Sequence, residues 1–563
     1  MGLDVIVLRS AFLALLIIVA AQAQESGKTK HATISGTVTD AATKQPIVKA
    51  VLTLRDVSAR YDDSKSSQTT TTDTAGRYEI HDVAAGEYDL RANKPGYLSA
   101  DYAVGTGKHR RSTNIAVTDG KDFTGMDLAM KRGGVISGRV LNEDGEPFPE
   151  VQVTAYHYGR MERGGKPRLL PWSRPVQTDD RGEYRIFDLD PAQYYVACAI
   201  QLTFNPNEID KNIKRAYPKT FYPAATSADA ATPIMVTAGG EAVANFALTT
   251  APAFTVKGKI VGATEQIPVI VTLNEPDLVF YAPQVGRMSK GDTFELPGVL
   301  PGTYQLTAQQ SPRSGEEPRF VTRKITVADT DLQDVTLSLN APYQPTPGSI
   351  QILGDQKIDP STLYLYLSSP AFAEDEDSSF ALAAGRFTQP RKDGSFTFSV
   401  IQPEGKFFVN VGAQRNELED WYTKSVFFAG RDVTDTGFSP APGGSLQVFL
   451  SPNGATVEGV VVDKDGKPVP GAEVTTVPEE AHRQRRDLYQ SGSTNQLGHF
   501  RIRGISPGSY KLLAVEDDET QSVFDTDFLK AHLASGTDLK VEEKGKYNVS
   551  VTIIPAEPED ATK

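Results

Sequence analysis

The sequence predicts an all-β protein, a tandem array of about five antiparallel β-sandwich domains. Three observations predict this fold class. The chain of 563 residues is too long for one hydrophobic core. Its 47 glycines and 36 prolines are typical of many turns between short strands. A pattern of strand and turn residues also recurs along the chain, and repeats of this kind indicate a repeated structural unit.

The N-terminus predicts a signal peptide. An apolar run at 11–20 follows Arg9, and an Ala-x-Ala pattern at Ala21 and Ala23 follows that run. We place cleavage after Ala23, with residues 1–23 as the signal peptide. An uncleaved anchor is the alternative, because the run is near the short end for a bilayer span. After signal removal we expect no membrane span and an exported protein, in the periplasm, at the cell surface or outside the cell.

The recurring unit is an aromatic residue, an aliphatic residue two positions later, a second aliphatic three positions further on, and a Pro-Gly-x-Tyr-like turn. In the last copy these are Phe500, Ile502, Ile505 and the stretch 507–510. Residues at i and i+2 of a strand share one face, so Phe500 and Ile502 are expected in a core. The five copies begin at Tyr78, Tyr184, Phe294, Phe396 and Phe500.

Turn signals surround each copy. The stretches "TDTAG", "TDDRG" and "TNQLG" precede three of them, where Asp or Asn bonds its own backbone and Gly takes a positive φ. A Gly-centred strand lies further upstream, as "ISGTV", "ISGRV", "VKGKI" and "VEGVV". In the fourth copy "GSIQILGDQKIDPSTLYLYL" replaces this opening. Alternating strands close each unit and predict domains at 24–131, 132–251 with long loops, 252–341, 342–453, which is divergent, and 454–563.

One helix is predicted, in "DTDFLKAHLASG". Asp525 is the expected N-cap, Phe528, Leu529 and Leu533 are apolar at helical spacing, and Gly536 is the expected stop. We interpret this helix as a lid on the last domain.

The first and last units resemble the carboxypeptidase regulatory-like domain. The resemblance rests on "ISGTV", "QPIVKAVLTL" and "TDTAGRYEIHDVAAGEYDL" in the first unit and on "VEGVVVDKDGKPVPGAEVTT" and "GHFRIRGISPGSYKLLA" in the last. It implies a transthyretin-like, Ig-like β-sandwich, related in fold to Cna protein B-type and starch-binding-like domains. The whole mature chain resembles exported bacterial proteins built from such repeats, which implies architecture more than activity.

Composition and motifs argue against several functions. A net charge of -13 without a long basic run argues against a nucleic-acid partner. None of the seven histidines is followed by Glu at the His-x-x-Glu spacing of a zinc carboxypeptidase, and there is no Gly-x-Ser-x-Gly elbow. Cys198, the only cysteine, is expected to be a small buried hydrophobe in a strand. We therefore expect no enzyme, no cofactor and no metal.

Two weaker patterns have simpler interpretations. Asp463 and Asp465 begin like a calcium loop, but the remaining ligands do not follow, so we expect a hairpin turn. An intramolecular isopeptide bond, as in some Cna B-type domains, would need Lys257 or Lys259 with Asn340 and Glu295. We expect these to be solvated strand residues.

The best binding candidate is the insertion 155–172. It interleaves Tyr156, Tyr158 and Trp172 with basic residues such as Arg160. Aromatic rings beside charged donors on a loop can stack on sugars or hold an acidic partner. The alternative is a surface loop whose rings fold back onto the sandwich. Trp421 in "LEDWY" is a second binding candidate with fewer aromatic and charged neighbours in the sequence.

Three functional hypotheses follow. The first is a non-catalytic, exported structural or interaction protein that binds an unknown protein or glycan partner in the cell envelope. The second is an array of carbohydrate-binding modules. The third is an accessory subunit of an envelope peptidase or transport complex, or an enzyme with an unrecognised site. Short linkers between the domains predict restricted interdomain motion.

Overall fold

A computed structural model describes residues 31–57, 67–104, 113–159, 168–172, 174–200, 213–263, 267–274, 285–288, 292–310, 319–339, 345–355, 358–368, 387–398, 406–413, 418–515, 523 and 526–555. The predicted signal peptide, its cleavage site at Ala23 and the candidate Arg160 lie outside these ranges. The chain divides into two compact units: residues 1–94, 99–102 and 114–130 form one, and residues 95–98, 103–113 and 131–563 form the other.

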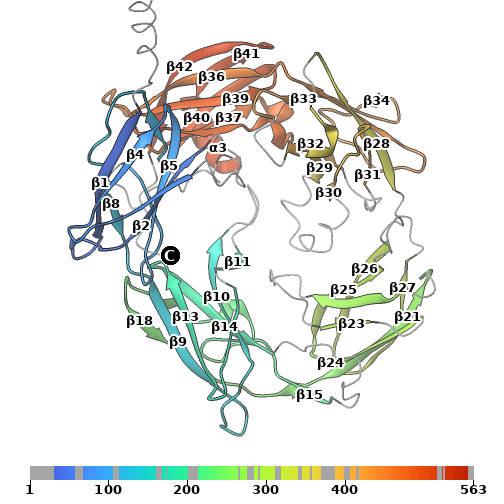
Figure 1. The fold of residues 1–563 in the computed structure, drawn as a ribbon. Helices are drawn as coiled ribbons and strands as arrows, with labels where there is room; N and C mark the ends of the chain where they lie inside the picture. The colour runs from blue at the N-terminus through green and yellow to red at the C-terminus, as the bar shows by residue number, and fades with distance from the viewer. Residues whose placement is uncertain are drawn as a thin grey trace, which may run out of the picture. The chain divides into compact units, whose positions relative to one another are not determined.

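The described chain is an all-β array of five sandwiches, as predicted (Figure 1). Each sandwich has a first strand that pairs antiparallel with the strand carrying the repeated aromatic residue, and parallel with the closing strand. The first strands are β1 (Ala32–Asp40), β9 (Gly134–Leu141), β21 (Phe254–Val261), β28 (Thr346–Ile352) and β36 (Ala455–Val462). The aromatic strands are β4 (Arg77–Val83), β13 (Glu183–Leu189), β24 (Thr293–Val299), β31 (Ser395–Phe398) and β39 (His499–Ile505).

The closing strands amend the purely antiparallel expectation. They are β8 (Leu128–Met130), β18 (Glu241–Val243) with β19 (Phe246–Ala247), β27 (Leu332–Ser338), β35 (Leu446–Ser451) and β42 (Lys546–Ile554). The first and last strands run in the same direction, and the chain between them passes through the second sheet. A parallel pair needs such a crossover.

The strands of the second sheets of sandwiches 1 and 2 pair antiparallel. In sandwich 1 the sheet is β2 (Val51–Asp56), β3 (Ser67–Thr71), β5 (Gly86–Asn93), β6 (Ala100–Asp101) and β7 (Ile115–Val117). In sandwich 2 it is β10 (Gln152–Gly159), β11 (Arg168–Pro171), β12 (Val176–Gln177), β14 (Gln193–Ala199), β16 (Thr220–Phe221) and β17 (Ile234–Met235), and β15 (Arg215–Ala216) pairs separately with β20 (Ala251–Pro252).

Sandwiches 3 and 4 have smaller second sheets. Sandwich 3 has β22 (Val269–Asn274), β23 (Val285–Met288), β25 (Gly302–Gln310) and β26 (Arg319–Val327). Sandwich 4 has β29 (Leu363–Ser368), β30 (Phe387–Thr388) and β32 (Phe408–Ala413), while β33 (Tyr422–Phe428) and β34 (Arg431–Asp432) extend the sheet of its first strand.

In sandwich 5 the two sheets merge. The strands β37 (Glu473–Pro478), β38 (Ser491–Ser493), β40 (Gly508–Val515) and β41 (Thr537–Val541) join β36 and β39, because β42 pairs with both β36 and β40. Short 3-10 turns occur at η2 (Ala228–Ala230), η3 (Pro360–Thr362), η5 (Glu480–His482), η6 (Arg486–Leu488) and η8 (Leu533–Ser535).

The repeated aromatic residue explains the central glycine of the first strand. In sandwich 5 Phe500 pairs directly with Gly459. A Cβ atom at Gly459 would overlap both the Phe500 ring and the backbone oxygen of Val549 on the closing strand. The same pairing occurs in the other four sandwiches, at Gly36↔Tyr78, Gly138↔Tyr184, Gly258↔Phe294 and Gly348↔Phe396. A Cβ atom at Gly36, Gly138 or Gly258 would likewise overlap a backbone oxygen of the closing segment, and at Gly348 it would overlap the Phe396 ring.

The tyrosine that ends the repeat also has a fixed partner. In sandwich 5 the Tyr510 hydroxyl donates a hydrogen bond of 2.9 Å to the backbone oxygen of Ser506. Tyr88, Tyr194 and Tyr304 make the same bond, each to the residue four positions earlier. In sandwich 4 the position holds Phe407, which has no hydroxyl. The phenol therefore satisfies a carbonyl of the tight turn that precedes it.

The other predicted local elements are confirmed. Asp73 Oδ1 accepts from the backbone nitrogens of Ala75 and Arg77, and Gly76 has φ 73°. The predicted core residues Phe500, Ile502 and Ile505 are buried. The helix α3 (Thr526–His532) is followed by η8, which ends at Gly536. The expected N-cap Asp525 lies outside the described ranges.

The helix covers a second apolar cluster of sandwich 5, as expected of a lid. Leu529 is buried in this cluster with Val477, Leu513 and Ile554, and Phe528 and Leu533 pack against it. The main core of the sandwich is separate and contains Phe500.

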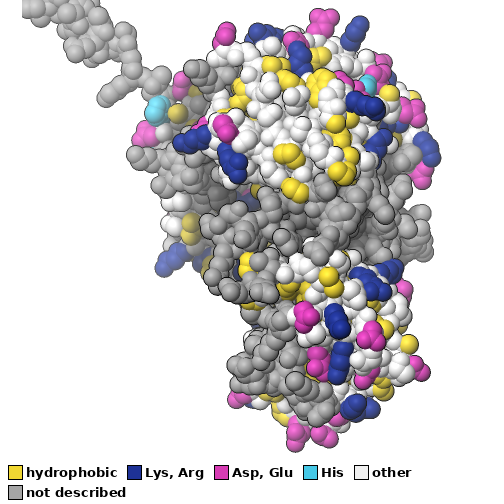
Figure 2. Space-filling view, turned by 90° about the vertical axis from the view of Figure 1, so that its right-hand side faces the viewer, with side chains coloured by type: hydrophobic (Ala, Val, Ile, Leu, Met, Phe, Trp, Pro, Cys, Tyr) yellow, Lys and Arg dark blue, Asp and Glu magenta, His cyan; other side chains and the backbone are white. Residues whose placement is uncertain are grey.

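Charges of both signs are mixed over the face in Figure 2, without a single-sign field. Within the described ranges, no helix is long and apolar enough to cross a bilayer.

Candidate functional site

The aromatic residues predicted for binding do not form one surface. Tyr156 pairs with Pro171 across the β10–β11 hairpin. The next residue, Trp172, donates its backbone N–H to Ala155 O. Directly paired residues share a face and successive residues alternate, so Trp172 lies on the opposite face of the sheet from Tyr156 and Tyr158.

Tyr156 is only 1 % exposed and packs with Phe221, whose ring centroid is 6.1 Å away. The expectation that Tyr156 takes part in an exposed binding loop is therefore wrong, because segment 220–231 covers that part of the sheet. Tyr158 lies two residues further along the strand, on the same face as Tyr156. It is 49 % exposed, and its ring meets the Tyr195 ring edge-on with 5.3 Å between the centroids.

Trp172 contacts two aromatic rings on the other face of this sheet. Its ring meets His157 edge-on at 4.8 Å and Tyr194 at 5.9 Å, and the residue is 41 % exposed. Trp421 is half-buried and packs against the core of sandwich 4. Tyr158 and Trp172 thus remain candidate contacts, on two separate surfaces.

The reactive or metal-binding candidates of the sequence have structural environments: a buried thiol, a hairpin turn and an ion pair. Cys198 is fully buried, and this burial raises the pKa of its thiol to about 12. Asp463 Oδ1 accepts from the backbone nitrogens of Asp465 and Lys467, which is the predicted hairpin turn. Lys257 Nζ lies 3.0 Å from Glu295 Oε1 in a half-exposed ion pair, while Asn340 lies outside the described ranges. Among the residues with described positions, no group of three His, Cys, Asp or Glu could hold a metal ion.

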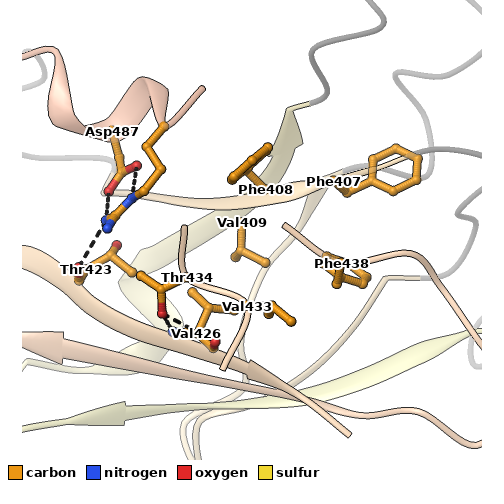
Figure 3. A pocket seen from close by; sticks show the side chains of 10 residues that line it. Phe407, Phe408, Val409, Thr423, Val426, Val433, Thr434, Phe438 and Asp487 are labelled. Atoms are coloured by element: carbon orange, nitrogen blue, oxygen red, sulfur yellow. Dashed lines mark hydrogen bonds and ion pairs between the residues drawn. The ribbon is translucent and has the colours of Figure 1, made fainter. Parts of the chain in front are cut away.

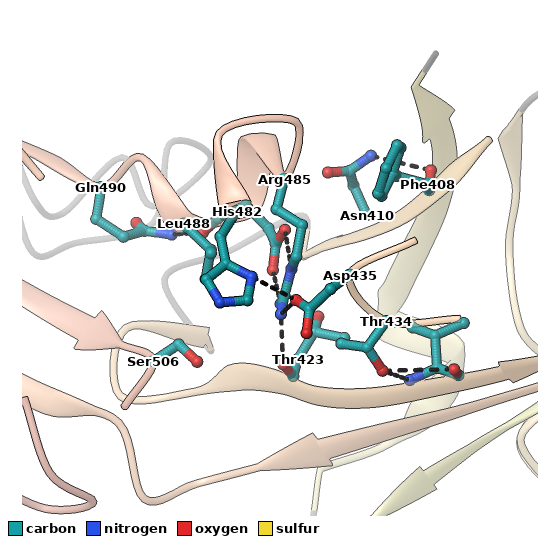
Figure 4. A network of polar contacts seen from close by, with 12 residues as sticks. Phe408, Asn410, Thr423, Thr434, Asp435, His482, Arg485, Leu488, Gln490 and Ser506 are labelled. Carbon is teal, nitrogen blue, oxygen red and sulfur yellow. Dashed lines mark hydrogen bonds and ion pairs between the residues drawn. The ribbon is translucent and has the colours of Figure 1, made fainter. Parts of the chain in front are cut away.

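A polar network that the sequence did not predict lies where sandwich 4 meets sandwich 5. We call it the joint, and it consists of residues 418–435 on one side, residues 479–487, 503–504 and 543 on the other, and the linker 452–454. The segment 479–490, which connects β37 to β38, supplies much of it (Figure 4). Its dense charges without strand alternation were the only available signal.

Arg485 is the centre of the joint. Its side chain is 9 % exposed, and it donates to both carboxylate oxygens of Asp487, at 3.2 and 2.6 Å. It also donates across the joint to Asp435 Oδ1 at 3.1 Å and to Thr423 O at 3.4 Å. Burial alone would lower the pKa of Arg485, but the two carboxylates outweigh burial and raise it. The guanidinium therefore stays charged.

Two further contacts cross the joint. Arg503 pairs with both Glu419 and Asp420. Glu543 accepts from the Tyr422 hydroxyl at 2.5 Å and from Lys424 Nζ at 2.9 Å. These donors lower the pKa of Glu543, the Tyr422 hydrogen bond being the larger cause.

The last linker residue, Gly454, has no room for a side chain. The Gly454 N–H donates to Asp420 O at 2.9 Å. A Cβ atom at Gly454 would lie 2.6 Å from the Cα of Gly504 and 2.7 Å from Asp420 O. Gly504 itself has φ 69°, a conformation that favours glycine.

Two cavities lie beside the network. An open cleft of about 470 Å³ is lined from both sandwiches, by residues that include Tyr422, Lys424, His482 and Tyr510. His482 Nδ1 lies 3.1 Å from Asp435 Oδ1 and Nε2 lies 3.4 Å from Glu479 Oε1. A small cavity of about 10 Å³ lies between Arg485 and the phenylalanines of sandwich 4 (Figure 3). Arg485, Arg503 and Lys424 each face a carboxylate of the other sandwich, so these ion pairs join sandwich 4 to sandwich 5.

Comparisons with known proteins agree with the predicted resemblance. Residues 33–131 and 456–553 match the family model of the carboxypeptidase regulatory-like domain. No curated protein matches the chain.

Several solved structures are similar to parts of the chain. The minor pilin GBS52 of Streptococcus agalactiae is 14% identical, with 39% of this chain and 97% of that chain covered and a TM-score of 0.20. The shaft pilin spaA of Lactobacillus rhamnosus GG is 12% identical, with 40% and 98% covered and a TM-score of 0.18. The Bacillus anthracis TIE protein is 12% identical, with 95% and 76% covered and a TM-score of 0.15. The likeness to these proteins is one of fold alone.

Proposed function

We propose that this protein is a non-catalytic, exported structural or interaction protein whose sandwiches, at 24–131, 132–251, 252–341, 342–453 and 454–563, space and present surface loops to a partner in the cell envelope. The observation that carries the proposal is how the chain uses its buried and half-buried charges. Arg485, Arg503 and Glu543 are paired between two sandwiches, and the repeated tyrosines are paired with turn carbonyls. Polar groups whose partners lie on a neighbouring domain or on a turn have a structural role.

The partner is tested by site-specific photo-cross-linking in intact cells. A photoreactive residue at the exposed position Tyr158 should capture a discrete envelope protein or glycan, whereas the same residue at the buried position Tyr156 should not. Equal capture from both positions, or none from Tyr158 and Trp172, would contradict binding through this part of sandwich 2. A captured peptidase or transporter subunit would instead favour the accessory-subunit alternative.

Export and the lack of catalysis have their own tests. N-terminal sequencing of the protein from the cell envelope should begin at Gln24. The purified chain should hydrolyse neither fluorogenic peptides nor glycosides. Turnover that follows the chain through successive purification steps would overturn the non-catalytic assignment.

Carbohydrate binding is a second candidate function, and one surface of sandwich 4 favours it. Tyr364 and Tyr366 point away from the core, and Phe387 pairs with Tyr366 on the same face. The Tyr364 ring lies 5.3 Å from Phe387 with 24° between the planes, and 6.3 Å from Tyr366 with 32° between them. Nearly parallel, half-exposed rings are the kind of surface on which a pyranose stacks.

The test is binding of the full chain to a polysaccharide panel. Replacing Tyr366 and Phe387 together by Ala should abolish binding, with Trp172→Ala as a comparison on another sandwich. If the wild-type chain binds no polysaccharide, this second function is excluded.

A further inference from the structure

We propose that the joint between sandwiches 4 and 5 is an electrostatic latch, which holds the two domains in one orientation at moderate ionic strength and releases them when its ion pairs are screened. This inference goes beyond the proposed function, because it states how an internal orientation of the array changes. It concerns only the contacts already described between residues 418–435 and sandwich 5.

The apolar cores end on each side of the joint. The core cluster of sandwich 4 contains residues between Ile350 and Leu450. The two clusters of sandwich 5 contain residues between Ala455 and Ile554. No cluster among the described residues spans both sandwiches. No apolar core therefore joins the two sandwiches, and the contacts that cross the joint between described side chains are polar.

Most of the polar contacts across the joint are open to solvent. The side chains of Arg503 and Asp420 are 32% and 44% exposed, and those of Lys424 and Glu543 are 48% and 39% exposed. Exposed ion pairs are each worth about 1 kcal/mol or less and are screened by salt. Several weak pairs acting together produce a contact that salt can undo.

Arg485 is the buried cation among the described residues of the joint. Separating the two members of a buried ion pair normally costs a large free energy, because the charge that stays buried is left without a counter-ion. Arg485, however, makes its shortest contact, 2.6 Å, with Asp487 of its own sandwich. If the domains separate, Arg485 loses Asp435 and Thr423 O but keeps this bidentate partner. Opening therefore leaves no buried charge without a counter-ion.

The linker between the two sandwiches would be the hinge of this movement. The linker between β35 and β36 is only residues 452–454, and its ends are held by Gly454 N–H to Asp420 O and Lys544 N–H to Asn453 O, both 2.9 Å. A linker this short restricts separation to a hinge motion. The cleft of about 470 Å³ beside Lys424 and Glu543 is the space that such a motion would widen or close.

The experiment measures distances between spin labels in the full chain. Cys198→Ala removes the native thiol, and labels are placed on exposed residues of the two sandwiches, Lys392→Cys and Lys464→Cys. Spectra are recorded at about 0.1 M and about 1 M NaCl, between which the Debye length falls from about 10 Å to about 3 Å. We expect a narrow distance distribution at low salt that broadens or shifts at high salt. A label pair within sandwich 5, at Lys464 and Lys540, should not respond.

A matched pair of variants separates the latch from general salt effects. Arg503→Gln removes a contact across the joint and should broaden the distribution already at low salt. Arg501→Gln lies two residues away on the same strand, where Arg501 pairs with Glu458 of its own sandwich at 3.0 Å, and should leave the distribution unchanged. A wild-type distribution that is broad at low salt, or that is identical at both salts and in Arg503→Gln, overturns the latch. None of these outcomes bears on cross-linking at Tyr158, so the two proposals can fail independently.

Discussion

Single residues of the repeat have roles that differ in kind. The aromatic residue and the glycine opposite it form a steric pair, whereas the final tyrosine forms a hydrogen bond to its own turn. Sandwich 4 lacks the hydrogen bond, because Phe407 replaces the tyrosine. It keeps the steric pair, at Gly348 and Phe396. The hydrogen bond is thus an addition to the fold, and the glycine is a requirement for it.

We expect Tyr510→Phe to lower the free energy of local opening of β40 by about 1 kcal/mol, the typical net worth of one hydrogen bond. The loss would leave Ser506 O without its 2.9 Å donor. Hydrogen exchange of the full chain, read by mass spectrometry over residues 508–515, measures it. Tyr304→Phe should produce the same loss in β25 and none in β40.

Gly459→Ala should be more damaging. Its Cβ would overlap Val549 O and the Phe500 ring, both of which belong to the packed core, and overpacking of this kind costs about 1–3 kcal/mol or more. We expect loss of exchange protection throughout β36 and β39. Glu458→Ala, at the exposed neighbouring position, should retain protection, and equal protection in both variants would contradict the steric argument.

At the scale of elements, α3 is the only helix of its length among the described residues, and it covers the outer cluster of sandwich 5. Its apolar face was readable from the sequence because Leu529 and Leu533 lie four residues apart, with Phe528 next to Leu529. What it packs against was not readable, because Val477 and Ile554 lie on strands far away in the sequence.

Leu529→Ala should remove about 2–5 kcal/mol from the stability of this outer cluster, as buried leucine truncations generally do. Leu529 is 5% exposed. The hydrogen-exchange rates of backbone amides in β37 and β40, which carry Val477 and Leu513 of this cluster, should rise. Lys530→Ala, whose side chain is 70% exposed, is the control and should change little.

At the scale of the whole molecule, the joint determines how two sandwiches are held, and its ionisable groups predict a pH window. The pKa of Glu543 is lowered from 4.5 by its hydrogen bond with Tyr422 and by Lys424, so its contribution is present above that value and is lost as pH falls through the lowered pKa. Burial and the bond to Glu543 raise the pKa of Tyr422 from 10.0 to about 12, so the neutral phenol contributes below pH 10 and is lost as pH rises toward 12.

The distance between labels on Lys392→Cys and Lys464→Cys should therefore be most sharply defined between these two limits and should broaden in acid and in strong alkali. Glu543→Gln should weaken the acid limb of the profile. A profile that is flat from acid to alkaline pH would show that Tyr422 and Glu543 do not hold the joint.

Much of the candidate site could not have been predicted from the sequence. Phe500 and Ile502 were assigned to a core from their spacing alone, because a strand repeats every two residues. The partners of Arg485 and Arg503 across the joint lie 50 to 84 positions away, and no local periodicity connects them. For the same reason Tyr156 and Trp172 were grouped, although the hairpin of β10 and β11 puts them on opposite faces.

The sequence by itself determined the all-β class, the repeated strand and turn units, the position of the helix, and the likeness of the first and last units to the carboxypeptidase regulatory-like domain. All of these depend on residues that are neighbours along the chain or that repeat at short spacing. Only the tertiary structure decided which rings are buried, which strands run parallel, and which charges meet at the joint. Those outcomes depend on how separate sheets pack, and the energies that select them come from contacts between residues that the sequence places far apart.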